Sequence, residues 1–326
     1  MGIADRERAL DGLIGHTGFV GSTLLTQHDF PARFNSANVS DLAGQRFGTL
    51  VCAAAPGSMF EANRFPERDA ARIDGLIARL DAVGPVERFV LVSTIAVIEG
   101  FACADEEHLT YETAIPYGVN RRRLEEFVAA RFPGALVVRL PALFGPGLKK
   151  NFLFDLLNPM PSMVPPAGLE QLREAVGGDL APLLDGLYPF DAELGMHVID
   201  RAALDAGGRR APLEAATARA GLSALRFASP ESRFQFYAME QLWSDIGLGL
   251  AAGLGVLHLA PPPLSTGEIH LALTGVPMPE TGARVHREDM RTRHAALWNL
   301  EGPYNATPET VIASLKAFFA REQVPA

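Results

Sequence analysis

A tyrosine and an arginine, Tyr117 and Arg121, lie four residues apart in a stretch that indicates the start of a helix. Residues at this spacing share one helix face. A guanidinium beside a phenol favours the phenolate, so we expect a lowered pKa for Tyr117. Such a tyrosine can donate or accept a proton at a carbonyl or alcohol oxygen. The alternative, which the spacing alone favours, is an aromatic anchor beside an exposed arginine.

Ser93 and Thr94 end an apolar run over residues 88–94, which is typical of a strand buried on both faces. In open parallel sheets, ligands bind outside the carboxyl ends of the strands. The two hydroxyls are therefore placed to touch a ligand. The alternative is a hydroxyl pair that satisfies the backbone of the following loop.

Three glycines recur at every third position, Gly15, Gly18 and Gly21, between an apolar run over residues 10–14 and a helix expected at 20–27. Glycine lets the backbone come close to a pyrophosphate, because it has no Cβ. A helix N-terminus then offers free N–H groups and a partial positive charge to the anion. The pattern predicts a dinucleotide site; the alternative is a turn that is merely tight.

The first 142 residues alternate strand patterns with helix patterns. Short apolar runs at 47–55, 88–94 and 135–140 predict buried strands, and helical spacing of apolar residues predicts helices at 64–83 and 117–132. This alternation predicts right-handed crossovers and a parallel sheet. Residues 34–42 leave little room for a further strand, so one unit of the sheet is abbreviated.

Beyond residue 147 the chain becomes rich in Pro, Ala, Gly and Leu. Here we expect helices at 168–176, 212–220, 239–252, 265–273 (capped by Ser265) and 308–321, and strands at 222–227, 233–237 and 255–260. The predicted fold is α/β, a Rossmann-type doubly wound parallel sheet with a smaller, mostly helical substrate domain. We expect the dinucleotide-binding domain at 1–146 plus about 228–262, and the substrate domain at about 147–227 plus 263–326.

The composition excludes several classes of function. A formal net charge of −9 over 326 residues argues against a nucleic-acid partner. The two cysteines have no disulfide or metal-ligand spacing and the eight histidines are not grouped, so we expect no metal. The first eight residues lack an apolar signal core, and no apolar run is long enough to span a bilayer. We therefore expect a cytoplasmic, enzyme-like protein with no membrane partner.

Taken together, these segments resemble the extended short-chain dehydrogenase/reductase superfamily, and most closely its NAD-dependent epimerase/dehydratase branch. The resemblance rests on GHTGFVG, VCAAA, LVSTIAVIEG, PYGVNRRRLEEF and VVRLPALFGPG, and it continues through RFQFY at 233–237 and the segment 289–298. It covers nearly the whole chain except residues 160–220. It implies hydride transfer between a nicotinamide and a carbinol carbon.

The resemblance also assigns roles to residues. It implies that Thr94 is the catalytic hydroxyl, that Tyr117 is the general acid/base, and that Arg121 occupies the family's lysine position. It places the substrate against Thr94, Ile95 and Arg233. The residues it places against the cofactor are Gly15, Thr17, Gly18, Phe19, Val20, Gly21, Asn35, Ser36, Asp41, Leu42, Ala53, Ala54, Tyr117, Arg121 and Pro141.

The sequence departs from the family pattern in three places. Arg121 stands where the family has lysine, and an arginine cannot join a relay by losing its proton. No acidic residue follows the second strand; Asn35 and Ser36 stand there, with Arg33 nearby, so either NAD or NADP is expected as the cofactor. The segment 98–100 replaces the usual Val-Tyr-Gly and alters one wall of the site.

The function that follows is an NAD(P)-dependent oxidoreductase or epimerase/dehydratase-like enzyme on a polar carbinol or carbonyl substrate, with a nucleotide sugar as one option. The alternative is a catalytically inactive NAD(P)-binding sensor or regulatory protein. A structural subunit without cofactor is disfavoured by the intact glycine turn. By analogy, helices 64–82 and 116–132 predict a homodimer; alternatively, their apolar stripes face only the chain's own sheet.

Overall fold

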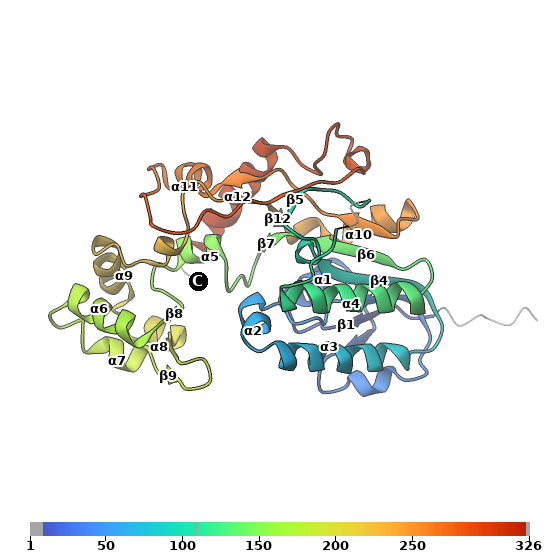
Figure 1. Ribbon diagram of the computed structural model, residues 1–326, viewed down its shortest axis with the longest axis horizontal. Coiled ribbons are helices and arrows are strands. Elements are labelled where there is room, and N and C mark those ends of the chain that lie inside the picture. The colour runs from blue at the N-terminus through green and yellow to red at the C-terminus, as the bar shows by residue number, and fades with distance from the viewer. Residues whose placement is uncertain (1–8, 108–109, 324–326) are drawn as a thin grey trace, which may run out of the picture. The chain divides into compact units, whose positions relative to one another are not determined.

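The described residues, 9–107 and 110–323, form two units in this computed structural model (Figure 1). The sheet unit holds the described residues of 1–148, 234–264 and 287–315. The helical unit holds those of 149–233, 265–286 and 316–326. The predicted domain boundaries, near residues 146, 227 and 262, concern domains that fold independently, and they stay a prediction.

A six-stranded parallel sheet is the centre of the sheet unit. Its strands lie in the order β13, β6, β4, β3, β1, β2. The chain passes from β2 at the edge, through the short 3-10 helix η1 (Val39–Leu42), to β3 on the far side of β1. The direction of winding therefore reverses between β1 and β3, which is where such sheets bind ligands. The strand bounds are Gly12–Ile14 for β1, Ala32–Phe34 for β2, Phe47–Cys52 for β3, Val86–Thr94 for β4, Leu136–Leu140 for β6 and Val256–His258 for β13.

Helices cover both faces of this sheet. On one face α3 (Pro66–Asp81) and α4 (Pro116–Arg131) run side by side (Figure 1) and pack on strand residues such as Leu50 and Leu91. On the other face α1 (Phe19–Gln27) and α10 (Leu242–Ala251) pack on Val51 and Val90. Neighbouring strand residues therefore alternate between two apolar layers, which is why the strands read as continuous apolar runs. The predicted Rossmann-type parallel sheet is confirmed.

Local signals explain where several helices begin. Pro66 and Pro116 stand in the first turns of α3 and α4, where no N–H bond is lost. Ser265 caps α11 (Thr266–Thr274) with a complete capping box to Glu268, as predicted. Further elements of the sheet unit are α2 (Met59–Arg64), η2 (Ile95–Val97), η4 (Met239–Gln241), η5 (Ala295–Trp298) and the paired strands β5 (Ala102–Ala104) with β15 (Asp289–Met290) and β7 (Ala142–Phe144) with β12 (Phe236–Ala238).

The helical unit has its own apolar core, which includes Leu169, Leu172, Leu184 and Leu213. Its helix α6 packs against a small antiparallel sheet with strand order β8, β10, β9. The bounds are α5 Phe152–Leu157, β8 Met163–Val164, α6 Pro166–Val176, α7 Leu183–Leu187, β9 Phe190–Asp191, β10 Met196–Val198, α8 Arg201–Ala206 and α9 Arg210–Arg219. The strands β11 (Arg233–Phe234) and β14 (Leu264–Ser265) and the helix α12 (Pro308–Glu322) lie where the chain passes between the units.

One predicted strand is wrong. Residues 222–227 contain the 3-10 helix η3 (Ala224–Phe227) instead. The main chain bonds locally, with Arg226 N donating to Ser223 O at 3.0 Å, and Ala224 N donates to Pro159 O at 2.8 Å. The apolar residues of this segment were taken for a buried strand, but no partner strand of the described chain lies beside them.

Candidate functional site

The glycine turn joins the carboxyl end of β1 to α1, and its three glycines differ in what they permit. Gly15 has φ +88°, and a Cβ there would lie 2.5 Å from the Ala53 carbonyl oxygen. A Cβ on Gly21 would collide with the Gly15 carbonyl oxygen. A Cβ on Gly18 would meet only that same oxygen, at 3.4 Å. Gly15 and Gly21 are therefore required by the fold, whereas the fold itself leaves room for a side chain at Gly18.

The N-terminus of α1 opens beside this turn. Gly18 is the N-cap, no side chain caps the helix, and its first turn carries no acidic residue. The first amides of the helix therefore keep their donors for another acceptor. His16 fixes the turn from the side, since its Nδ1 lies 3.0 Å from the Phe34 carbonyl oxygen at the end of β2. The turn is a rigid frame around an uncapped helix end, which is the geometry that suits an anion.

The residues predicted at the adenosine lie on the neighbouring strand ends. Asn35 forms a tight turn after β2, with its Oδ1 accepting from Ala37 N at 2.9 Å, and Ser36 is exposed on that turn. Arg33 Nη2 donates to Asp29 Oδ1 at 3.2 Å, and Arg33 Nε donates to the Phe30 carbonyl oxygen. Asp41 is exposed, whereas the side chain of Leu42 is fully covered by the core. Of the predicted set, the exposed groups here are Ser36 and Asp41.

Tyr117 and Thr94 come together at the carboxyl edge of the sheet. Tyr117 lies in the first turn of α4, where its N–H donates to Asn63 Oδ1 at 3.1 Å. Its hydroxyl lies beside the hydroxyl of Thr94, the last residue of β4, which acts to lower the pKa of Tyr117. Thr94 also caps η2 by accepting from Ala96 N at 3.2 Å. Two hydroxyls from different elements are thus held as a pair.

Arg121 is enclosed beside this pair. Its side chain is 2% exposed and forms a two-armed ion pair with Asp69 of α3, with Nη1–Oδ2 at 2.5 Å and Nη2–Oδ1 at 2.9 Å. Asn120 also donates to Asp69 Oδ2, at 2.8 Å. The guanidinium carbon lies 4.0 Å from the centroid of the Tyr117 ring, so the arginine stacks on the ring face.

The expectation of a lowered pKa for Tyr117 is wrong. Burial raises the pKa of Tyr117 and outweighs the lowering by Arg121 and by the Thr94 hydrogen bond. The negative charge of Asp69 adds to the increase. The sequence spacing did place the arginine beside the tyrosine, but it could not show the carboxylate that shares the arginine's charge.

A second buried network, which the sequence pattern did not predict, lies at the carboxyl ends of β4, β6 and β13. Ser93, Arg139 and His258 stand side by side on β4, β6 and β13. Arg139 forms a two-armed pair with Glu125 of α4, at 3.0 and 2.7 Å, and Ser93 Oγ donates to the same carboxylate at 2.6 Å. Arg139 Nη1 lies 3.2 Å from His258 Nε2.

This network ties loops to the sheet through Glu106. Its carboxylate accepts from His258 N at 2.9 Å and from the Thr292 hydroxyl at 2.6 Å. Burial lowers the pKa of His258, which leaves a neutral ring that accepts from Arg139 and donates to the Arg291 carbonyl. A sequence signal existed: Glu125 comes directly after Leu124, a residue of the apolar helix face, so it lies close to the buried side of the helix.

The remaining predicted residues are more scattered. Ile95 and Pro141 are buried, and Ala53 and Ala54 are half-buried beside the glycine turn. Arg233 is exposed and belongs to the helical unit, where its charge lowers the pKa of Glu268 after the stronger effect of Ser265. The sheet unit thus gathers the glycine turn, Thr94, Tyr117 and Arg121 at one sheet edge.

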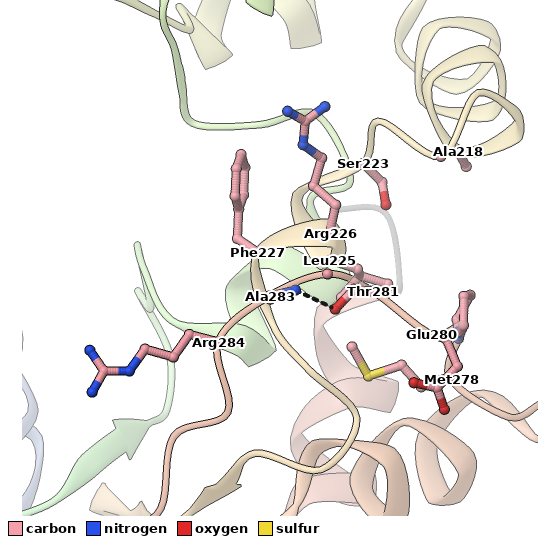
Figure 2. Close-up of a pocket in the computed structure, with 13 residues that line it drawn as sticks. Ala218, Ser223, Leu225, Arg226, Phe227, Met278, Glu280, Thr281, Ala283 and Arg284 are labelled. Atoms are coloured by element: carbon pink, nitrogen blue, oxygen red, sulfur yellow. Dashed lines mark hydrogen bonds between the residues drawn. The ribbon is translucent and has the colours of Figure 1, made fainter.

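A cavity of about 710 Å³ lies within the helical unit, between η3 and residues 278–284. None of the predicted site residues lines it. Figure 2 shows Thr281 near its centre, with the guanidinium groups of Arg226 and Arg284 pointing in different directions away from it. The two guanidinium groups do not point toward a common position, so the cavity is not arranged to bind an anion.

Among residues 9–107 and 110–323, no three His, Cys, Asp or Glu side chains are grouped so that they could hold a metal ion. No helix in the same span is long and apolar enough to cross a membrane. The prediction that the protein uses no metal stays a prediction.

Solved structures of nucleotide-sugar enzymes resemble this chain over nearly its whole length. The dTDP-4-dehydrorhamnose reductase from Bacillus anthracis in complex with NADP is 12% identical, with a TM-score of 0.59 and coverage of 96% of this chain and 98% of that chain. MoeE5 in complex with UDP-glucuronic acid and NAD is 17% identical, with a TM-score of 0.58 and coverage of 96% and 99%. UDP-glucose 4-epimerase from Thermotoga maritima with UDP-glucose is 14% identical, with a TM-score of 0.56 and coverage of 95% and 97%.

These similarities are structural. No family model matches the sequence, and no curated protein matches it. At such identities the likeness shows the fold alone, which is the Rossmann-type α/β fold that these solved structures share and that the sequence predicted. The activities and ligands of the neighbours bear on this chain only as support for a proposal.

Proposed function

We propose that this chain is an NAD(P)-dependent oxidoreductase or epimerase/dehydratase-like enzyme that acts on a polar carbinol or carbonyl compound, with a nucleotide sugar as the substrate class. The observation that carries the proposal is the glycine turn at the reversal of winding, together with the paired hydroxyls of Thr94 and Tyr117 on the same sheet edge. Solved structures with this fold contain NAD, NADP or nucleotide sugars.

The residues at the turn fit a dinucleotide. Gly18 has room for a side chain that the sequence omits, which is expected where a pyrophosphate passes close to the backbone. The uncapped amides of α1, at Phe19 and Val20, would face the phosphates, with Gly15, Thr17 and Gly21 shaping the turn. Ser36 and Asp41 would contact the adenosine end, and Ala53, Ala54 and Pro141 would line the path to the nicotinamide.

The protein's own groups would handle the proton. A bound nicotinamide dinucleotide would supply or accept a hydride at the substrate carbon. Tyr117 would exchange a proton with the substrate oxygen, and the hydroxyl of Thr94 would hold that oxygen through a hydrogen bond. In the reducing direction, the substrate oxygen gains the Tyr117 proton and the carbon gains the hydride, so the carbonyl becomes a carbinol.

The cofactor and the alternative function remain proposals. NAD and NADP are both admitted by Asn35 and Ser36, since neither carries a charge that would exclude a 2′-phosphate. An inactive NAD(P)-binding sensor is favoured by one observation: Arg121 is committed to Asp69 rather than held ready at the lysine position. Both functions share the same binding site, so turnover distinguishes them.

The homodimer and the cytoplasmic location stay predictions. The apolar stripes of α3 and α4, with Ile73, Leu80, Leu124 and Val128, pack on the chain's own core. The outer face of α3 carries small residues, Ala71, Gly75 and Ala78, which permit a close approach of another helix. Sedimentation equilibrium of the purified chain measures its mass in solution: twice the chain mass supports the dimer, and the chain mass alone contradicts it.

Turnover by a Tyr117→Phe variant tests the function. We expect purified parent protein to oxidise or reduce NAD(P) with at least one member of a panel of nucleotide sugars. The variant should lose about 10²- to 10⁴-fold in turnover with unchanged cofactor affinity, because only the proton donor is removed. Parent protein that binds the cofactor but is inactive on the whole panel supports the sensor. A variant with parental turnover contradicts the role of Tyr117.

A further inference from the structure

Two ion pairs join α3 to α4, and their environments differ. Arg123 and Asp74 meet at 2.9 Å on the surface, with side chains 42% and 62% exposed. Arg121 and Asp69 meet in the interior, with side chains 2% and 4% exposed. Only the inner pair contacts Tyr117. Because burying an ion pair is costly, its retention beside a proposed proton donor needs a reason.

In the inner pair, both terminal nitrogens of the Arg121 guanidinium donate all their hydrogens to other groups of the protein. Nη1 donates to Asp69 Oδ2 and, at 3.3 Å, to the Tyr117 carbonyl oxygen. Nη2 donates to Asp69 Oδ1 and to the Pro56 carbonyl oxygen. All four Nη hydrogens therefore have acceptors, and Nε is buried without a hydrogen-bond partner among the described residues. Arg121 has no accessible donor for a ribose hydroxyl, unlike an extended lysine.

We propose that Asp69 is a positioning residue of the site: by holding both arms of Arg121, it keeps the arginine stacked on the Tyr117 ring and turns its donors away from the phenol hydroxyl. The proposal rests on the proposed function, in which Tyr117 moves a proton.

The charges around the phenol agree with this arrangement. The groups that face Tyr117 are Arg121 on its own helix, Asp69 on α3 and the Thr94 hydroxyl at the end of β4. Arg121 and Thr94 lower the pKa of Tyr117, Asp69 raises it, and burial has the largest effect and raises it. The Asp69 carboxylate thus opposes the effect of the arginine that it holds.

Removing the Asp69 charge tests the proposal. We expect Asp69→Asn to move the ionisation of Tyr117 to lower pH, because the arginine then acts on the phenol unopposed. The measurement is an ultraviolet titration of phenolate formation, from which the titration of Tyr117→Phe in the same background is subtracted to isolate Tyr117 among the five tyrosines. Asp74→Asn is the matched control, since it breaks the outer pair between the same two helices and should leave Tyr117 unchanged.

Each outcome is decisive. A Tyr117 titration that is identical in Asp69→Asn and in the parent overturns the proposal, as does a parental Tyr117 that ionises near neutral pH. If Asp69→Asn fails to fold, the double variant Asp69→Asn with Arg121→Gln is measured in its place, because it buries no charge at this position. We then expect at least tenfold lower kcat with unchanged cofactor Kd; unchanged kcat overturns the proposal. If the parent protein shows no turnover, only the proposed function is contradicted, because the titration of Tyr117 needs neither cofactor nor substrate.

Discussion

The fold leaves room for a side chain at Gly18, so the absence of one there is explained by a ligand and not by the fold. The sequence pattern predicted all three glycines equally, as the rim of one phosphate-binding turn. The structure divides them, because only Gly15 and Gly21 face their own backbone at distances that exclude a Cβ. The spacing of glycines could predict the turn, but it could not tell which glycine leaves space open to the outside.

A Gly18→Val variant should fold but lose the dinucleotide. Gly18 has φ −77°, a conformation that valine adopts, and its Cβ direction is open. The branched side chain would occupy the path of the pyrophosphate, so we expect at least tenfold weaker cofactor binding, about 1.4 kcal/mol. Fluorescence titration with NADH and NADPH measures the affinity, and thermal unfolding checks the fold. A folded variant with parental affinity would remove Gly18 from the site.

Arg121 shows the limit of sequence reasoning for single side chains. The spacing of four residues correctly placed it beside Tyr117. Its partner Asp69 lies 52 residues away on another helix; burial raises the pKa of Tyr117, and the charge of Asp69 adds to that increase. A signal was present in the sequence, since Asp69 falls four residues before Ile73 on the buried face of α3. A carboxylate on an apolar face predicts a buried partner.

At the scale of elements, the sequence predicted the strands but not the contacts between them. The apolar runs that became β4, β6 and β13 were all expected. Their register brings Ser93, Arg139 and His258 into one row, and continuous apolar runs, which are buried on both faces, do not show which residues of neighbouring strands pair. The same limitation explains the error at η3, because whether a short apolar segment becomes a strand depends on a partner strand.

The Glu125–Arg139 pair anchors α4 to the strand ends, so its loss should destabilise the sheet unit. Glu125→Gln leaves the Arg139 charge buried and unpaired, and we expect a loss of about 3–5 kcal/mol in the free energy of unfolding. The adjacent Glu126→Gln is the control. It breaks a half-exposed pair with Arg122 and should cost about 0–1 kcal/mol. Urea unfolding measures both, and equal losses would contradict the anchoring role.

In the whole molecule, each unit carries a buried titratable group, and the two groups make the stability of the fold depend on pH in opposite directions. In the sheet unit, burial lowers the pKa of His258, so the unfolded chain binds more protons and stability falls as the pH drops below 6.5. In the helical unit, burial raises the pKa of Asp155 to about 7 despite Arg201. There the folded state binds more protons, so stability falls as the pH rises from about 4 toward 7.

An Asp155→Asn variant should lose the pH dependence of the helical unit. We expect it to be more stable than the parent at pH 8, with a smaller difference at pH 5, because the parent must ionise a buried carboxyl as the pH rises. Both tryptophans, Trp243 and Trp298, lie in the sheet unit, so their fluorescence reports on that unit while circular dichroism reports on helices of both. A difference in stability that is the same at pH 5 and pH 8 would refute the assignment.

The proposed function depends on the binding of a nicotinamide dinucleotide at the glycine turn. Isothermal titration calorimetry of the purified parent chain with NADH and with NADPH measures this binding directly. We expect saturable binding of at least one of them, with one molecule per chain. Heats no larger than those of dilution, for both nucleotides up to millimolar concentration, would contradict it.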